Sequence, residues 1–276
     1  DRADVLAGAT PPVIKRKGLT VAEGSLARQV AVVTGAGRGV GRAMARLFAA
    51  EGADVAICAR TATQLEPVAE ELRAGGTKVV SQTVDITEWE QVQAFANEVA
   101  AQLGPVNVLI NNAAAGADLD NIADSDAPAW AKTAITNVIG PYFVSRGFIP
   151  HLKDGARIVN FGSGNGHVPV ARRSAYGVGR AGLSMLTKCM ALELWERGIE
   201  VNEFIPGPTA TVMLPWAMHL DDEDEIARQF ADRPSPENPS ERAKTPMEAA
   251  EHVLWMVTRP PGGPTGQLYS LMRRPV

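Results

Sequence analysis

From Gln29 onward, short apolar runs alternate with longer amphipathic stretches along most of the chain. Residues 30–33 are all apolar, which is typical of a strand buried on both faces, whereas the apolar residues of 39–51 recur at helical spacing. The same alternation predicts further strands at 53–59, 78–84, 106–111, 157–161, 200–205 and 266–271, and further helices at 63–74, 87–103, 130–149, 175–197 and 245–258. We therefore expect an α/β protein with a single doubly wound parallel sheet of about seven strands and helices on both faces.

The alternation breaks down in two segments. Residues 1–25 have no continuous apolar stretch, so we expect an N-terminal extension outside the core fold and no signal peptide. Residues 209–242 contain four prolines and an acidic run, which predicts an irregular excursion with one or two short helices. Because there is no linker, repeat or second composition regime, we expect one domain over residues 26–276.

The composition argues against several classes of protein. Of the 276 residues 45% are hydrophobic, enough for a large core, and the net charge of -4 gives no basic face for nucleic acid. No apolar run reaches the 18 residues that a membrane span needs. Cys58 and Cys189 are too few for a disulfide scaffold or a zinc site. We therefore expect no metal, two buried thiols and a location in the reducing cytoplasm.

A glycine-rich loop, Thr-Gly-Ala-Gly-Arg-Gly-Val-Gly at 34–41, follows the first predicted strand and opens the first predicted helix. A helix N-terminus offers unpaired N–H groups and the positive end of a dipole to a pyrophosphate. Glycines there permit the tight turn and the close approach of backbone to phosphate. The strand–loop–helix context favours a dinucleotide site of Rossmann type over a merely flexible loop.

The spacing Gly35-x-x-x-Gly39-x-Gly41 resembles the short-chain dehydrogenase/reductase family, in particular its classical members similar to 3-oxoacyl reductases. The resemblance extends over residues 26–270, nearly the whole chain. It implies a Rossmann-type fold, a nicotinamide cofactor and oxidoreductase activity on a small molecule. It also implies a homo-oligomer, a tetramer or a dimer, with the tetramer built on the two long helices.

The residues after the second predicted strand bear on which nicotinamide is used. An NAD site needs an acidic residue there for the ribose 2′-hydroxyl, whereas an NADP site needs a cation. This strand ends at Ala59 and is followed by Arg60, and Arg38 adds a second guanidinium within the glycine loop. Guanidinium groups bind phosphate through charge-assisted hydrogen bonds. The pattern favours NADP(H) over NAD(H), the alternative being that both arginines are solvated surface residues.

Other segments resemble cofactor-binding elements of the family. Asp85 and Ile86 resemble the pair that brackets the adenine, and residues 111–113 resemble the Asn-Asn-Ala-Gly element, with Ala114 in place of its glycine. Residues 206–211 resemble the Pro-Gly element whose backbone contacts the nicotinamide amide. Together with the tyrosine and arginine discussed next, the implied cofactor-binding residues are Gly35, Gly37, Arg38, Gly39, Val40, Gly41, Arg60, Asp85, Ile86, Asn112, Ala113, Tyr176, Arg180, Pro206, Gly207, Thr209 and Thr211.

Reduction of a carbonyl by hydride needs an acid that protonates the developing alkoxide. The resemblance implies that Tyr176 is this acid/base and that Ser163, thirteen residues earlier, orients the substrate oxygen. It also implies that Asn137, on the preceding long helix, orders a water in the proton path. The fourth catalytic position, four residues after the tyrosine, holds Arg180 where the family has lysine.

The arginine at this position leaves three functions open. Arg180 keeps the positive charge that stabilises a phenolate, but its pKa above ~12 prevents it from passing on a proton. The chain is then an arginine-adapted reductase, an enzyme diverted to non-redox elimination or isomerisation, or a dinucleotide sensor without turnover.

The excursion at 209–242 resembles the family's substrate lid. Its first part is apolar and includes Met213 and Trp216, which fits a hydrophobic substrate as well as it fits ordinary packing. His167, four residues after Ser163, is a further candidate for the substrate pocket, with a solvated loop histidine as the alternative.

Overall fold

The computed structural model describes residues 24–116, 120–213, 223–235 and 238–272. The expected N-terminal extension therefore lies almost wholly outside the described residues, as does Trp216. The main sheet is parallel throughout and has seven strands, as expected from the sequence. Their spatial order is β3 (Val79–Thr83), β2 (Asp54–Ala59), β1 (Val30–Thr34), β4 (Val106–Asn111), β5 (Leu152–Phe161), β6 (Glu200–Ile205) and β9 (Leu268–Ser270).

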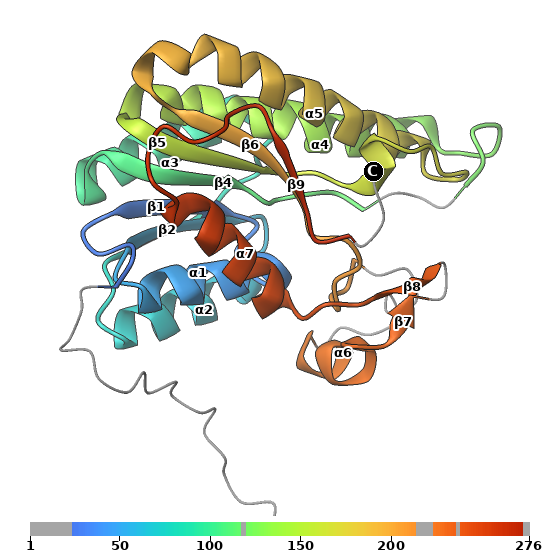
Figure 1. The fold of residues 1–276 in the computed structure, drawn as a ribbon, viewed down its shortest axis with the longest axis horizontal. Coiled ribbons are helices and arrows are strands. Elements are labelled where there is room, and N and C mark those ends of the chain that lie inside the picture. Colours follow the sequence, from blue (N-terminus) through green and yellow to red (C-terminus); the bar gives the residue numbers. More distant parts are fainter. Residues whose placement is uncertain (1–23, 117–119, 214–222, 236–237, 273–276) are drawn as a thin grey trace, which may run out of the picture.

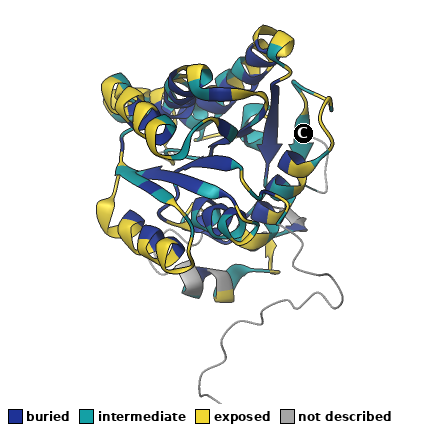
Figure 2. Cartoon of the chain, turned by 90° about the vertical axis from the view of Figure 1, so that its left-hand side faces the viewer, coloured by how far each residue is buried: buried dark blue, intermediate teal, exposed yellow. Residues whose placement is uncertain are grey.

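Helices cover both faces of this sheet (Figure 1). One face carries α1 (Gly39–Ala50), α2 (Ala62–Ala74) and α7 (Pro246–Thr258), and the other carries α3 (Trp89–Leu103), α4 (Ala127–Phe148) and α5 (Ser174–Glu193). Figure 2 shows the consequence: the central strands are mostly buried, and the outer helices expose the sides that face away from the sheet.

The central strand β1 shows why the strands are apolar at every position. Ala31 and Val33 belong to the core beneath α1, α2 and α7, whereas Val30 and Val32 belong to the core beneath α3 and α4. Successive side chains of a strand point to opposite faces, so a sheet covered on both sides has no solvent-facing positions in its centre.

The strand order reverses between β1 and β4. The chain builds outward from β1 to β3, and α3 then carries it back across the sheet to pair β4 with the other side of β1. The loops after β1 and β4 leave in opposite directions at this point, which opens a crevice outside the carboxyl ends of the strands. The glycine loop lies here.

The excursion between β6 and α7 is more ordered than expected. It contains one short helix, α6 (Glu223–Phe230), as predicted, but also an antiparallel pair, β7 (Pro234–Ser235) and β8 (Asn238–Arg242), which was not predicted. The two strands have only two and five residues, too short for a periodic pattern. Ala210, Ile226 and Ala243 form a small core of their own here.

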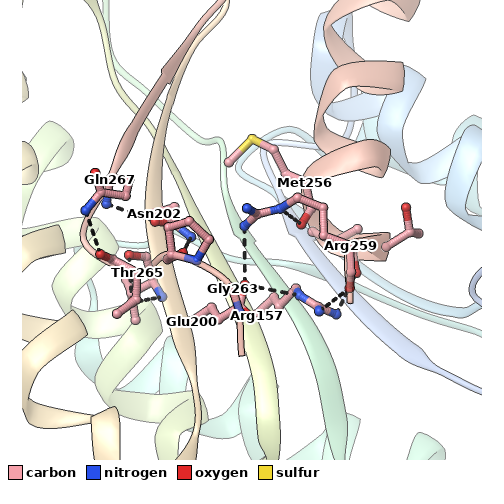
Figure 3. A network of polar contacts seen from close by, with 12 residues as sticks. Arg157, Glu200, Asn202, Met256, Arg259, Gly263, Thr265 and Gln267 are labelled. Carbon is pink, nitrogen blue, oxygen red and sulfur yellow. Dashed lines mark hydrogen bonds and ion pairs between the residues drawn. The ribbon is translucent and has the colours of Figure 1, made fainter. Parts of the chain in front are cut away.

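A buried polar network fastens the sheet to its last strand (Figure 3). The Glu200 carboxylate on β6 pairs with Arg157 (3.5 Å) and Arg259 (3.3 Å) and accepts a hydrogen bond from the Gly263 amide (2.9 Å). Arg157 also donates to the carbonyl oxygens that end α7, Val257 and Arg259. The charge of Glu200 is therefore compensated although the residue is only 5% exposed.

A capping box begins α7. Thr245 accepts a hydrogen bond from the Glu248 amide, and the Glu248 carboxylate accepts one from the Thr245 amide. Hydrogen bonds from Arg242, followed by the capping amide, hold the pKa of Glu248 at about 2, and partial burial opposes them only in part.

Because the pKa of Glu248 is lowered from 4.5 to about 2 by folding, its ionised form stabilises the native state above pH 4.5. This stabilisation is lost as the pH falls from 4.5 toward 2. We therefore expect Glu248→Gln to lower the free energy of unfolding at pH 6 and to flatten its decrease over that window, measured by urea denaturation. The control is Glu251→Gln on the same helix. Equal pH slopes in the wild type and Glu248→Gln would contradict the assignment.

Candidate active site

The glycine loop between β1 and the start of α1 has a backbone conformation and close contacts that favour glycine. Gly35 has φ +67°, and a Cβ added to it would lie 2.9 Å from the Ala113 Cα. A Cβ on Gly41 would lie 2.2 Å from the Gly35 carbonyl oxygen. Glycine is therefore required for this loop to fold back against the start of α1 and the end of β4.

Thr34 and Asn112 join the loop to β4. The Thr34 hydroxyl donates to the Ile110 carbonyl (3.2 Å) and accepts from the Asn112 and Ala113 amides (both 3.1 Å). The Asn112 side chain donates to the carbonyls of Thr34 (2.8 Å) and Gly35 (3.2 Å). These bonds span the reversal of strand order and determine the shape of the crevice.

A cavity of about 200 Å³ occupies the crevice. Most of the predicted cofactor-binding residues line it, namely Gly35, Gly37, Arg38, Gly39, Val40, Gly41, Arg60, Ile86, Asn112, Ala113 and Thr211, together with Met213 from the predicted substrate set. The lining also includes residues that were not predicted as cofactor-binding, namely Cys58, Ala59, Thr61, Gln64, Val84, Ala114, Thr136 and Val212. Position was an available signal for five of them, because Cys58, Ala59, Thr61, Val84 and Ala114 lie at or just after the carboxyl end of a predicted strand, whereas Gln64 and Thr136 lie within helices.

The walls of this cavity fit a dinucleotide phosphate. Helix α1 starts at its edge, with no side-chain cap and no acidic residue in the first turn, so its first N–H groups have no intrahelical partner. Arg38 and Arg60 are exposed at the rim, and within the described part of the chain neither forms an ion pair. Burial raises the pKa of the Cys58 thiol to about 12, so this cavity residue is no thiolate nucleophile.

Tyr176, Ser163 and Arg180 lie together in the structure. Tyr176 and Arg180 are one turn apart near the start of α5, and Ser163 follows β5. The Tyr176 hydroxyl is hydrogen-bonded to both Ser163 and Arg180. The Arg180 guanidinium carbon lies 5.0 Å from the centre of the tyrosine ring.

These contacts determine the ionisation of Tyr176. Burial is the largest influence and by itself would raise the pKa of the tyrosine. The charge of Arg180, the hydrogen bonds from Arg180 and Ser163, and the charge of Arg173 together outweigh it, so the pKa lies below its ordinary value of 10. The site favours the phenolate in the way a tyrosine base requires.

The Arg180 side chain is only 3% exposed. Its Nη1 donates to the Phe161 carbonyl at the end of β5 (2.5 Å), which directs the guanidinium along the strand ends. Its Nε has no hydrogen-bond partner in the structure. A buried N–H without a partner is costly, and a hydroxyl group of a bound molecule would satisfy it.

Asn137 is fully buried where α4 meets α5. Its amide accepts from the Ala115 N–H and donates to the Ala115 carbonyl (both 3.1 Å), so the side chain holds the loop after β4. A Cβ on Gly179 would lie 2.6 Å from the Asn137 Cβ, so this glycine permits the close packing of the two helices. The fourth residue after Asn137 is Pro141, which has no N–H for the Asn137 carbonyl.

Six of the predicted cofactor residues do not line the cavity, and two of these, Tyr176 and Arg180, lie beside Ser163 instead. Asp85 binds the Thr87 amide (2.9 Å) and hydroxyl (2.7 Å), and Pro206, Gly207 and Thr209 lie further along the strand ends. The His167 Nε2 lies 3.0 Å from the Glu203 carboxylate on β6. Glu203 was not singled out from the sequence, because a strand pattern does not show which loop residue a buried acid meets.

The cysteine prediction was half wrong. Cys58 is buried on β2, but Cys189 is exposed on α5, because the apolar residues around it are shared between the sheet-facing and outer sides of a helix. Among the described residues, no cluster of His, Cys, Asp and Glu has the make-up of a metal site. None of the described helices is long and apolar enough to cross a membrane.

The strand order, with a cavity at its reversal, defines a Rossmann-like protein. Residues 29–219 match the family described as short chain dehydrogenase. The chain therefore belongs to the short-chain dehydrogenase family of oxidoreductases.

Similar proteins include reductases of this family. A putative ketoacyl reductase of Streptomyces coelicolor is 33% identical over 83% of this chain and 90% of its own. NADPH-dependent aldehyde reductase 1 of Arabidopsis thaliana is 29% identical over 83% of this chain and 79% of its own. The crystal structure of a blue fluorescent protein from a metagenomic library, in complex with NADPH, superposes with a TM-score of 0.76 at 28% identity, over 90% of this chain and 97% of the other.

The geometry predicts how Tyr176 titrates. Replacing Arg180 by methionine removes its charge and its hydrogen bond, so we expect the pKa of Tyr176 to rise. This pKa is measured from the ultraviolet absorbance of tyrosinate, after subtraction of the absorbance of the matching Tyr176→Phe protein. Arg180→Lys should raise it less, because the charge remains. Arg173→Met is the matched control and should also give a smaller rise, since Arg173 contributes only charge. An unchanged or lower pKa in Arg180→Met would refute the coupling.

Proposed function

We propose that this protein is an NADP(H)-dependent oxidoreductase that transfers hydride between the nicotinamide and a carbonyl or alcohol carbon of a small hydrophobic molecule, most simply as a ketoreductase. The observation that carries the proposal is the contact of Tyr176 with both Ser163 and Arg180. Family membership and the similarity to two named reductases support it.

In this proposal the bound cofactor supplies or accepts the hydride, and the protein handles the proton. Ser163 orients the substrate oxygen, and the Tyr176 hydroxyl donates its proton to the developing alkoxide. Arg180 then stabilises the phenolate that remains, and its Nε is a donor for a ribose hydroxyl. The lowered pKa of Tyr176 makes the same residue a usable base for alcohol oxidation.

Arg180 cannot relay the proton that returns to Tyr176, so a water path must supply it. We assign this path to the backbone at Asn137. The side chain of Asn137 is occupied by Ala115, whereas its backbone carbonyl has no intrahelical donor at Pro141, and in this proposal it accepts a hydrogen bond from the water.

The cofactor preference follows from the two arginines at the cavity rim. Arg38 and Arg60 flank the end of β2, where no acidic residue is present to bind a ribose 2′-hydroxyl. Their guanidinium groups suit the 2′-phosphate of NADP(H). The NADPH named for one relative and bound in one structural neighbour agrees with this preference.

We assign the substrate side to the start of the excursion, where Val212 and Met213 border the cavity and the neighbouring loop. We further propose a homo-dimer or homo-tetramer that uses α4 and α5. Exposed apolar side chains form one stripe on each helix, namely Ile135, Ile139 and Tyr142 on α4, and Val178, Met185 and Leu192 on α5.

Arg180 at the position of the family's lysine is also compatible with two other functions, non-redox chemistry by Tyr176 and cofactor sensing without turnover. The deciding experiment is NADPH oxidation with a panel of ketones and quinones, for the wild type, Arg180→Lys and Tyr176→Phe. We expect turnover by the wild type and a loss of about 10²–10⁴-fold in Tyr176→Phe, because the acid is removed.

Activity only in Arg180→Lys would contradict the arginine-adapted reductase. Product formed without a change in nicotinamide absorbance would establish the non-redox function. Tight NADPH binding without turnover in either protein would favour the sensor.

Removal of the rim arginines should change cofactor selectivity. We expect Arg38→Ala and Arg60→Ala each to weaken NADPH binding about ten- to a hundredfold, the effect of one lost charge-assisted hydrogen bond, and to leave NADH binding nearly unchanged. Fluorescence titration with both cofactors measures this, and Arg73→Ala on the exposed side of α2 is the control. Equal weakening of both cofactors would argue against a 2′-phosphate site.

A further inference from the structure

Glu203 is a buried acid on the strand next to the edge strand β9. It lies on β6, is only 2% exposed and pairs in register with Asn160 on β5. Burying a carboxylate is costly unless a partner compensates its charge. The His167 Nε2 lies 3.0 Å from the Glu203 Oε1, within hydrogen-bond distance.

The same carboxylate oxygen also lies against Gly162. A Cβ added to Gly162 would be 1.9 Å from the Glu203 Oε1, so only glycine leaves room for the acid. The Gly162 amide is bound to β6 as well, through the Phe204 carbonyl (2.8 Å). Gly162 directly precedes Ser163, and His167 lies four residues after Ser163.

Between these two points the segment is held by short-range contacts and by packing on α5. The Ser163 hydroxyl accepts from the Asn165 amide (3.3 Å), and the Gly166 amide donates to the Ser163 carbonyl (2.9 Å). Gly166 packs on the backbone of Arg180, where a Cβ would lie 2.8 Å from the Arg180 carbonyl carbon. The direction of the Ser163 hydroxyl therefore depends on where the two ends of the segment are fixed.

We propose that Glu203 and His167 are positioning residues for Ser163: one buried carboxylate fixes both ends of the segment 162–167 and so keeps the serine hydroxyl on Tyr176. The proposal rests on the proposed function only for the role of Ser163 in turnover. If the Glu203–His167 pair served stability alone, breaking the pair would leave the contact between Ser163 and Tyr176 unchanged.

The test monitors the contact between Ser163 and Tyr176 through the pKa of Tyr176, in the intact protein without substrate or cofactor. Tyrosinate absorbance, corrected with Tyr176→Phe proteins, gives the pKa of Tyr176 in each variant. Ser163→Ala is the reference and should raise the pKa, because the serine hydrogen bond lowers it. Glu203→Leu should raise it by a comparable amount, since the serine is released.

The matched control is Glu203→Gln, which removes the same charge but keeps an acceptor for His167. It should leave the pKa of Tyr176 at or below the wild-type value. Equal shifts in the Leu and Gln variants would overturn the proposal, because charge alone would then explain both. If Glu203→Leu fails to fold, His167→Phe and Gly162→Ala carry the test, and a wild-type pKa in both would overturn the proposal.

Turnover separates this inference from the proposed function. With a ketone that the wild type reduces, we expect Glu203→Leu and Ser163→Ala each to lower kcat about ten- to a hundredfold and to leave the KM for NADPH unchanged. If the wild type has no reductase activity but the titrations behave as expected, the proposed function fails and the positioning role stands.

Discussion

Both faces of the seven-stranded sheet are covered by helices, so its side chains are almost all committed to the two cores. Groups that act on a ligand can then be presented only at strand ends and by the loops that follow them. The glycine loop, the cavity-lining residues after β2 and β4, and Ser163 after β5 all lie at this carboxyl edge. The reversal of strand order between β1 and β4 opens the edge at one place.

Two buried charges in this framework, Glu200 and Arg180, are each compensated by specific contacts. Glu200 is held between two arginines and accepts a hydrogen bond from Gly263, in the loop before the last strand. Arg180 lies between the Phe161 carbonyl and Tyr176, where its charge offsets the cost of burying a phenolate. In the reaction that we propose, arginine at this position keeps the electrostatic part of the chemistry and gives up proton transfer, and we assign the proton path to the backbone near Asn137 and Pro141.

Much of the fold was predictable because its signals are local. The apolar runs located every strand of the main sheet, and β4 and β6 begin and end where the pattern predicted. The glycine loop was found for the same reason, since strand, glycines and helix are contiguous. The pair of β7 and β8 was missed because two-residue and five-residue strands rich in proline carry no periodicity. Cys189 was misplaced because an apolar neighbourhood in sequence is not one face of a helix.

The sequence by itself determined the succession of strands and helices along the chain, the glycine loop and the tyrosine–arginine pair. Each of these depends on residues that are close to one another in the sequence. Only the tertiary structure decided which distant groups meet: Ser163 with Tyr176, Asn137 with Ala115, and Glu203 with both Gly162 and His167. Those contacts arise from strand register and from the packing of α4 on α5. Both are set by the summed burial of two cores, which no local pattern encodes.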